Sequence, residues 1–142
     1  MKRTAAARWA GDLSSGNGTL RTASGAVRGA YSFQSRFEEG TGTNPEELLG
    51  AAHAACFSMA LSHALASAGH RPTSVDTTAT VHLVKGEQGL AITQIDLQTQ
   101  GIVPGLSAEE FARFADETKQ GCIISRALSA VPMSLHASLV PG

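Results

Sequence analysis

Cysteine is scarce in this sequence: among 142 residues there are only two, Cys56 and Cys122. Neither belongs to a close-spaced pair of the kind that holds a structural metal ion. A chain of this length rarely depends on a single structural disulfide, and in a cytosolic protein a disulfide is more often catalytic or redox-sensing. The two thiols therefore suggest a working redox pair.

An excess of charge of either sign is also missing. The 11 basic and 12 acidic residues leave a formal net charge of −1, and the basic residues form no dense run. This argues against nucleic acid or an anionic membrane surface as a partner. The first residues resemble the start of a signal peptide, but Arg8 and Asp12 interrupt them before an apolar stretch can form. We expect no membrane-spanning stretch elsewhere. A cytoplasmic location is the default expectation.

Internal repeats, low-complexity segments and domain linkers are absent as well. The chain is long enough to bury a core of its own. Hydrophobic residues make up 42% and charged residues 16%, which is typical of a compact folded protein. We therefore expect one domain over residues 1–142.

The first 37 residues are rich in Gly, Ser and Thr and predict three short strands. Turn-forming residues 14–18 favour a hairpin between the first two. Alternation then places Tyr31, Phe33 and Phe37 on one face of a third strand. On this pattern alone, Arg36 is an exposed residue at the end of that strand.

A long helix is predicted from about Asn44 to Ala68. Asn44 can cap it, Pro45 suits the first helical position, and Glu47 completes a capping arrangement. Gly69 marks its end. Apolar residues surround this helix almost completely, so we expect it to be a buried central element.

Two long strands should follow, over residues 75–83 and 90–97, with a shift in alternation that predicts a β-bulge near Thr93 and Gln94. The remaining predicted elements are a helix opened by a capping box at Ser107 and closed by Gly121, a short helix over Ile123 to Ser129, and a strand over Met133 to Val140. Together these elements predict an α+β fold with antiparallel sheets around a long buried helix.

Reactivity at Cys56 would require help, because the thiolate is the nucleophile and burial in apolar packing favours the thiol. Cys122 follows Gly121 at a helix start, where backbone N–H groups favour an anion. Cations that could lower the pKa of Cys56 are Arg36, Arg126, Lys119 and a protonated His53.

Other interpretations of these residues stay open. A lone buried cysteine is commonly a small core residue. His53, Cys56 and Cys122 could share a zinc ion, but a fourth ligand is not evident. Glu46, like Arg36, has an ordinary interpretation, as a carboxylate favoured at a helix start.

Several blocks closely resemble the osmotically inducible protein C (OsmC) subfamily of the OsmC/Ohr proteins, and together they cover nearly the whole chain. His53, before the cysteine, is typical of OsmC proper rather than the Ohr branch. The matching blocks are residues 36–38, 42–48, 51–61, 72–79, 103–105 and 119–122.

The resemblance implies an antioxidant thiol peroxidase that reduces organic hydroperoxides, and hydrogen peroxide less readily. Cys56 would be the peroxidatic nucleophile and Cys122 the resolving thiol, joined during turnover as an intramolecular disulfide. Arg36 would stabilise the thiolate and orient the peroxide, while Glu46 would hold Arg36 by a salt bridge. One departure is Ile123, which stands where the family typically has proline after the second cysteine.

The resemblance also implies an intertwined OsmC-like homodimer and a dithiol reductant of the lipoyl type; we expect no cofactor and no metal. Glu46 and Cys56 lie ten residues apart on the predicted helix, which is about 15 Å along its axis. If both line one pocket, they must come from different subunits, or the helix must break between them. A non-enzymatic redox sensor and a metal- or ligand-binding stress protein are the alternative functions.

Overall fold

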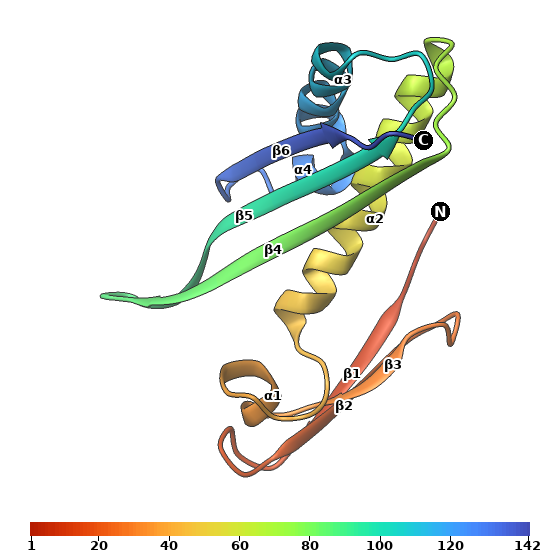
Figure 1. Cartoon of the computed structure of the whole chain (residues 1–142). Coiled ribbons are helices and arrows are strands. Elements are labelled where there is room, and N and C mark those ends of the chain that lie inside the picture. The colour runs from red at the N-terminus through yellow and green to blue at the C-terminus, as the bar shows by residue number, and fades with distance from the viewer. The chain divides into compact units, whose positions relative to one another are not determined.

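The computed structural model describes all 142 residues, in two compact units. The N-terminal unit comprises Met1–Leu48 and the C-terminal unit comprises Leu49–Gly142. Figure 1 shows strands and helices in both units, and one long helix whose residues begin in the first unit and end in the second. The predicted α+β class is confirmed.

The N-terminal unit holds a three-stranded antiparallel sheet, β1 (Ala5–Ala10), β2 (Asn17–Thr22) and β3 (Arg28–Tyr31), in the order β1-β2-β3 (Figure 1). The predicted hairpin is confirmed, with Ala10 paired to Asn17 across the turn. The Asp12 carboxylate holds this turn by accepting hydrogen bonds from the Ser15 backbone N–H at 2.8 Å and hydroxyl at 2.7 Å.

The third strand is shorter than predicted, because it ends at Tyr31 and a helix, α1 (Phe33–Phe37), follows. Ser32 and Ser35 form a reciprocal capping box, with N–H to hydroxyl distances of 2.8 and 3.1 Å, and this starts the helix. Phe33 and Phe37 are then one helical turn apart, with ring centroids separated by 5.0 Å. The expectation that Arg36 ends a strand is therefore wrong, since it lies on α1.

The long helix α2 (Pro45–Ser67) begins and ends almost where the sequence predicted. The Asn44 side chain accepts a hydrogen bond from the Glu47 backbone N–H at 2.8 Å. The Glu47 carboxylate accepts from the Thr43 hydroxyl at 2.8 Å rather than completing a reciprocal box. Gly69, with φ of +91°, ends the helix in the left-handed conformation that favours glycine.

Only one face of α2 is buried in this chain, which corrects the expectation of a helix enclosed on all sides. His53, Phe57, Leu61 and Leu65 recur every four residues and are fully buried. On another face Met59 is 77% exposed. A uniformly apolar composition does not specify which side faces the core, so the pattern could not reveal this exposed face.

By length and composition alone, α2 could also cross a membrane, contrary to the expectation that no such stretch exists. A core helix of a soluble protein meets the same criteria. Phe57, Leu61 and Leu65 pack in the same core as Ile95 and Leu97 of the C-terminal sheet, so we describe α2 as a core helix.

Besides most of α2, the C-terminal unit contains a second sheet, in the order β4-β5-β6, and two further helices (Figure 1). The predicted bulge is confirmed: His82 pairs with Gln94 and Leu83 with Ile92, which leaves Thr93 as the extra residue. The elements are β4 (Ser74–Gly86), β5 (Gly89–Ile102), α3 (Ala108–Gly121), α4 (Ile123–Ala127) and β6 (Met133–Leu139).

The last strand corrects the expectation of purely antiparallel sheets. β4 and β5 are antiparallel, but β6 runs parallel to β5, with Ile95 opposite Met133 and Gly101 opposite Leu139. Parallel neighbours require a crossover connection, and here α3 and α4 provide it. The predicted capping box at Ser107 opens α3, and Phe111 and Ala115 on this helix are fully buried.

Candidate active site

The fold brings the two cysteines together, with Cys122 Sγ 3.1 Å from Cys56 Sγ. Both thiols are free. Cys56 lies in the middle of α2 and is partly exposed, whereas Cys122 lies between α3 and α4 and is only 2% exposed. The sequence predicted a buried Cys56, but Cys56 is only partly buried, and Cys122 is the more deeply buried of the two thiols.

Local structure explains the position of Cys122. It is both the C-cap of α3, with its N–H donating to the Thr118 carbonyl at 2.8 Å, and the N-cap of α4, with its carbonyl accepting from the Arg126 N–H at 2.9 Å. Its extended ψ of 133° turns the chain from one helix to the next. Cys56 immediately precedes Phe57 on the buried face of α2, which places its thiol at the edge of that face.

The surroundings shift the pKa values of the two thiols in opposite directions. Burial raises the pKa of Cys56, the neighbouring Cys122 raises it further, and the backbone N–H groups of Ile124 and Ile123 only partly oppose this. Burial also acts to raise the pKa of Cys122, but the Ser125 and Ile124 backbone N–H groups, the Cys56 thiol and the Ser125 hydroxyl together lower it. The structure of one chain therefore favours negative charge on Cys122 first.

No cation is among the largest causes that shift the pKa of Cys56 within this chain. Arg126 and Lys119, which lie in the same unit, are therefore not the main influence on its thiol. His53 does not act as a cation either, because burial lowers its pKa and favours the neutral imidazole. Arg36 is the remaining candidate of those that the sequence suggested.

His53 occupies an environment that the sequence did not predict. It is fully buried, and its Nε2 lies 2.7 Å from the Ser125 hydroxyl oxygen. Its Nδ1 has no hydrogen-bond partner. No cluster of three or more His, Cys, Asp or Glu residues is arranged to hold a metal ion, so the suggested zinc site has no supporting geometry. Sequence reasoning missed Ser125, because nothing in the pattern places it beside His53.

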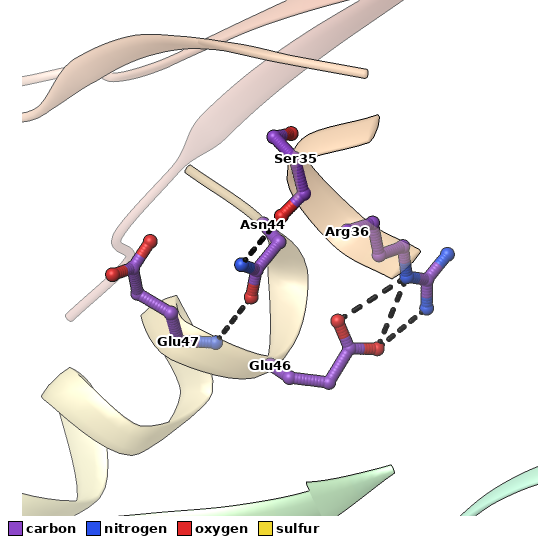
Figure 2. Close-up of polar contacts among 5 residues, drawn as sticks. All are labelled: Ser35, Arg36, Asn44, Glu46 and Glu47. Atoms are coloured by element: carbon purple, nitrogen blue, oxygen red, sulfur yellow. Dashed lines mark hydrogen bonds and ion pairs between the residues drawn. The ribbon is translucent and has the colours of Figure 1, made fainter. Parts of the chain in front are cut away.

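Arg36 and Glu46 form the second arrangement, within the N-terminal unit (Figure 2). The guanidinium Nη2 donates to Glu46 Oε1 at 2.6 Å, and Nε is 3.2 Å from both carboxylate oxygens. Glu46 is 8% exposed, while the Arg36 side chain is 37% exposed. The structure therefore contains the expected salt bridge, with a held guanidinium that is still accessible.

Two hydrogen bonds of Asn44 fix this pair. Its side-chain amide donates to the Ser35 carbonyl at 3.1 Å, while its oxygen accepts from the Glu47 N–H (Figure 2). Asn44 thereby ties α1, which carries Arg36, to the first turn of α2, which carries Glu46. A planar guanidinium held in this way is a fixed donor for an anionic or polar oxygen.

A cavity of about 420 Å³, half of whose lining residues are aromatic, lies beside Arg36 within the same unit. The Arg36 guanidinium carbon also stacks 5.1 Å from the centre of the Phe37 ring. The lining residues are Trp9, Gly11, Leu13, Tyr31, Ser32, Phe33, Arg36 and Phe37. This cavity could hold an apolar group next to a positive charge.

Two curated relatives resemble the chain closely. It is 52% identical over 125 residues to Peroxiredoxin OsmC of Escherichia coli (strain K12), and this match covers 87% of each chain. Peroxiredoxin OsmC of Shigella flexneri matches with the same identity and coverage.

Solved structures show the same fold at lower identity. The organic hydroperoxide resistance protein OhrB of Bacillus subtilis matches with a TM-score of 0.72 and 23% identity, covering 96% of this chain and 98% of its own. An OsmC-like protein from Mycoplasma pneumoniae matches with a TM-score of 0.76 and 16% identity, covering 99% and 98%. The family model described as OsmC-like protein matches residues 38–136, which include the Glu46, Cys56 and Cys122 positions. The chain therefore belongs to the OsmC-like protein family.

Proposed function

We propose that this chain reduces organic hydroperoxides to alcohols, with Cys56 as the peroxidatic nucleophile and Cys122 as the resolving thiol. The observation that carries this proposal is the 3.1 Å separation of the two sulfurs, which lets a disulfide form with little movement. The coarser expectation of a peroxidase is confirmed, since two relatives that are 52% identical to this chain over 125 residues are peroxiredoxins.

In the first step, the Cys56 thiolate attacks the distal peroxide oxygen. The oxygen–oxygen bond breaks, the alkoxide takes up a proton and leaves as an alcohol, and Cys56 becomes a sulfenic acid. Because the pKa of Cys56 is raised in the isolated chain, this step requires a cation at the thiol. We assign that role to Arg36, whose guanidinium would also offset charge on the leaving oxygen. Glu46 holds Arg36 in place.

The geometry of α2 supports a site shared between two copies of the chain. The helix is continuous from Pro45 to Ser67, so Glu46 and Cys56 of one chain are separated by about 15 Å along its axis. Arg36 is bound to Glu46. The exposed face of α2 around Met59 would bury apolar surface in a homodimer. We therefore propose that Arg36 and Glu46 of one subunit complete the site around Cys56 of the other.

In the second step, the Cys122 sulfur attacks the Cys56 sulfenic acid. A sulfur–sulfur bond forms, the sulfur–oxygen bond breaks, and hydroxide leaves as water with the proton given up by Cys122. An external dithiol then reduces the disulfide by exchange and is itself oxidised. A dithiol of the lipoyl type fits this requirement because one molecule supplies both electrons.

Cytoplasmic location stays a prediction.

The cavity beside Arg36 supports an organic substrate. Hydrogen peroxide has no apolar surface to bury, whereas an alkyl or aryl peroxide could place its hydrocarbon part against Phe33 and Phe37. We therefore expect cumene hydroperoxide to be consumed faster than hydrogen peroxide when dihydrolipoamide is the electron donor.

The decisive measurement is steady-state consumption of these two peroxides by the wild type, C56S and C122S. C56S should lose consumption altogether, because it lacks the nucleophile. C122S should consume peroxide much more slowly than the wild type, because its sulfenic acid has no resolving thiol in the chain and must wait for attack by the external dithiol. Full consumption by C56S would refute the proposal, and a wild type that stops after about one equivalent, despite excess dithiol, would indicate a sensor.

A further inference from the structure

Three arginines gather on one face of the N-terminal sheet, although they are well separated in the sequence. Arg21 on β2 lies directly opposite Arg28 on β3, and on its other side it lies opposite Ala6 of β1. Arg8 follows Ala6 by two residues, so its side chain is a diagonal neighbour of Arg21 on the same face. All three arginines are exposed. The sequence contains no dense basic run, and the strand pairing alone brings these charges together.

No acidic side chain balances this charge. The ion pairs of the chain involve other cations. Among the first 31 residues Asp12 is the only acidic one, against five that are basic, and its carboxylate accepts hydrogen bonds from Ser15 in the turn between β1 and β2. Like charges directly opposite each other in a sheet are destabilising. The pairing of Arg21 with Arg28 therefore costs stability unless an anion lies between them.

A cavity of about 610 Å³ lies at the three arginines. Its lining includes all three of them, together with the short side chains of Ala6 and Thr19. Short side chains between long ones leave space for a ligand between the guanidiniums, and the Thr19 hydroxyl adds a further donor. The volume falls within the range of about 300–1,000 Å³ that is typical of small-molecule sites.

The arginines lie on the opposite face of the sheet from the candidate active site. Trp9 follows Arg8 in β1, and neighbouring residues of a strand point to opposite faces. Trp9 and Tyr31, whose ring centroids are 5.4 Å apart, line the cavity beside Arg36. The peroxidase chemistry proposed above uses that cavity and the cysteines, and it gives the arginine face no role.

We propose that Arg8, Arg21 and Arg28 form a binding site for a phosphate-bearing anion. The planar guanidinium matches phosphate oxygens in a bidentate arrangement. A terminal phosphate offers three acceptor oxygens and a charge of about −1.5 to −2, so it can accept from three guanidiniums at once. A carboxylate has two oxygens and a single charge, and it matches three cations less well. A soluble phosphorylated molecule and a phospholipid headgroup both carry this group.

The first test is a calorimetric titration of the full chain with pyrophosphate at low ionic strength, since salt screens exposed charges. R21Q and R28Q should each bind about tenfold more weakly than the wild type, because each loses charge-assisted hydrogen bonds. R71Q is the matched control: it removes an exposed arginine from the C-terminal unit and should bind like the wild type. Acetate should not compete with pyrophosphate.

Thermal unfolding separates a ligand site from a structural role. Without an anion, R28Q should be at least as stable as the wild type, because it removes a like-charge pair. Pyrophosphate should raise the melting temperature of the wild type more than that of R28Q, since a ligand stabilises the folded state that binds it. If R28Q melts well below the wild type without anion, Arg28 serves the fold, and the assignment is overturned.

Flotation with phosphatidylcholine vesicles, prepared with and without phosphatidic acid, identifies the source of the phosphate. Binding to pyrophosphate but not to these vesicles supports a soluble ligand, whereas binding to phosphatidic acid that R21Q and R28Q lose supports a lipid headgroup. The proposal is overturned if the wild type binds neither, or if R71Q weakens binding as much as R28Q. C56S should bind pyrophosphate like the wild type, so this result does not depend on peroxide reduction.

Discussion

Single side chains in this protein acquire their properties from donors supplied by several elements. Asp96 on β5 is the clearest example outside the cysteine pair. Its carboxylate accepts hydrogen bonds from Ser134 of β6 at 2.6 Å, from His82 of β4 at 2.5 Å and from Gln94 at 3.1 Å. With the Ser134 hydroxyl as the largest cause, these contacts lower the pKa of Asp96 to about 2. One carboxylate therefore joins three strands.

This pKa has a consequence for acid stability. A carboxyl with a lower pKa in the folded state stabilises the fold above its unfolded value of 3.8, and the stabilisation disappears as the pH falls toward about 2. We expect the melting temperature of the wild type to fall more steeply than that of D96N between pH 5 and pH 2. D76N is the control, since the Asp76 carboxylate accepts no side-chain hydrogen bond. Parallel curves for D96N and wild type would contradict the prediction.

Helices and strands were predictable where local chemistry decides them. Asn44 and Gly69 indicated the ends of α2, and the phase shift at Thr93 indicated the bulge. α1 was missed because an alternating aromatic pattern also fits a helix once Ser32 and Ser35 cap each other. The parallel pairing of β6 depends on the crossover through α3 and α4, which is tertiary information.

The same distinction between local and tertiary information applies to the candidate active site. The sequence and its resemblance identified Cys56, Cys122, Arg36 and Glu46 as candidates, but the 3.1 Å sulfur contact required the fold. Ser125 could not be selected from the pattern, because nothing in the sequence places it against a histidine 72 residues away.

Close packing between β5 and α3 gives a prediction for an element contact. A Cβ atom on Gly101 would lie 2.5 Å from the ring of Phe111, which is fully buried. G101A should therefore destabilise the protein by about 1–3 kcal/mol, measured by urea unfolding. G121A, where a Cβ meets nothing within 4 Å, should be neutral or slightly stabilising. Equal stabilities of the two variants would show that β5 and α3 pack less tightly than described.

At the scale of the whole molecule, the two arrangements of candidate residues belong to different units. Arg36 and Glu46 lie in Met1–Leu48, whereas both cysteines lie in Leu49–Gly142. The proposed homodimer unites them by pairing Arg36 of one subunit with Cys56 of the other. It also gives the exposed face of α2 a partner.

Mixing two inactive variants tests this arrangement. R36A should lose activity by about 10²-fold, because the leaving oxygen and the thiolate lose their cation, and C56S should be inactive. Co-expressed or refolded together, half of the dimers should be mixed, and each should contain one native site. About a quarter of wild-type activity should therefore return. Mixtures no more active than their components would place Arg36 and Cys56 of the same chain in one site, or in none.

The place of Cys122 at the junction of α3 and α4 has one further consequence. A covalent link from there to the middle of α2 would tether segments that are remote along the chain, and such a tether restricts the unfolded ensemble far more than the folded one. The oxidised form that carries this disulfide should then be the most stable against unfolding. Reduction by the dithiol restores the reactive thiols and also lowers that stability.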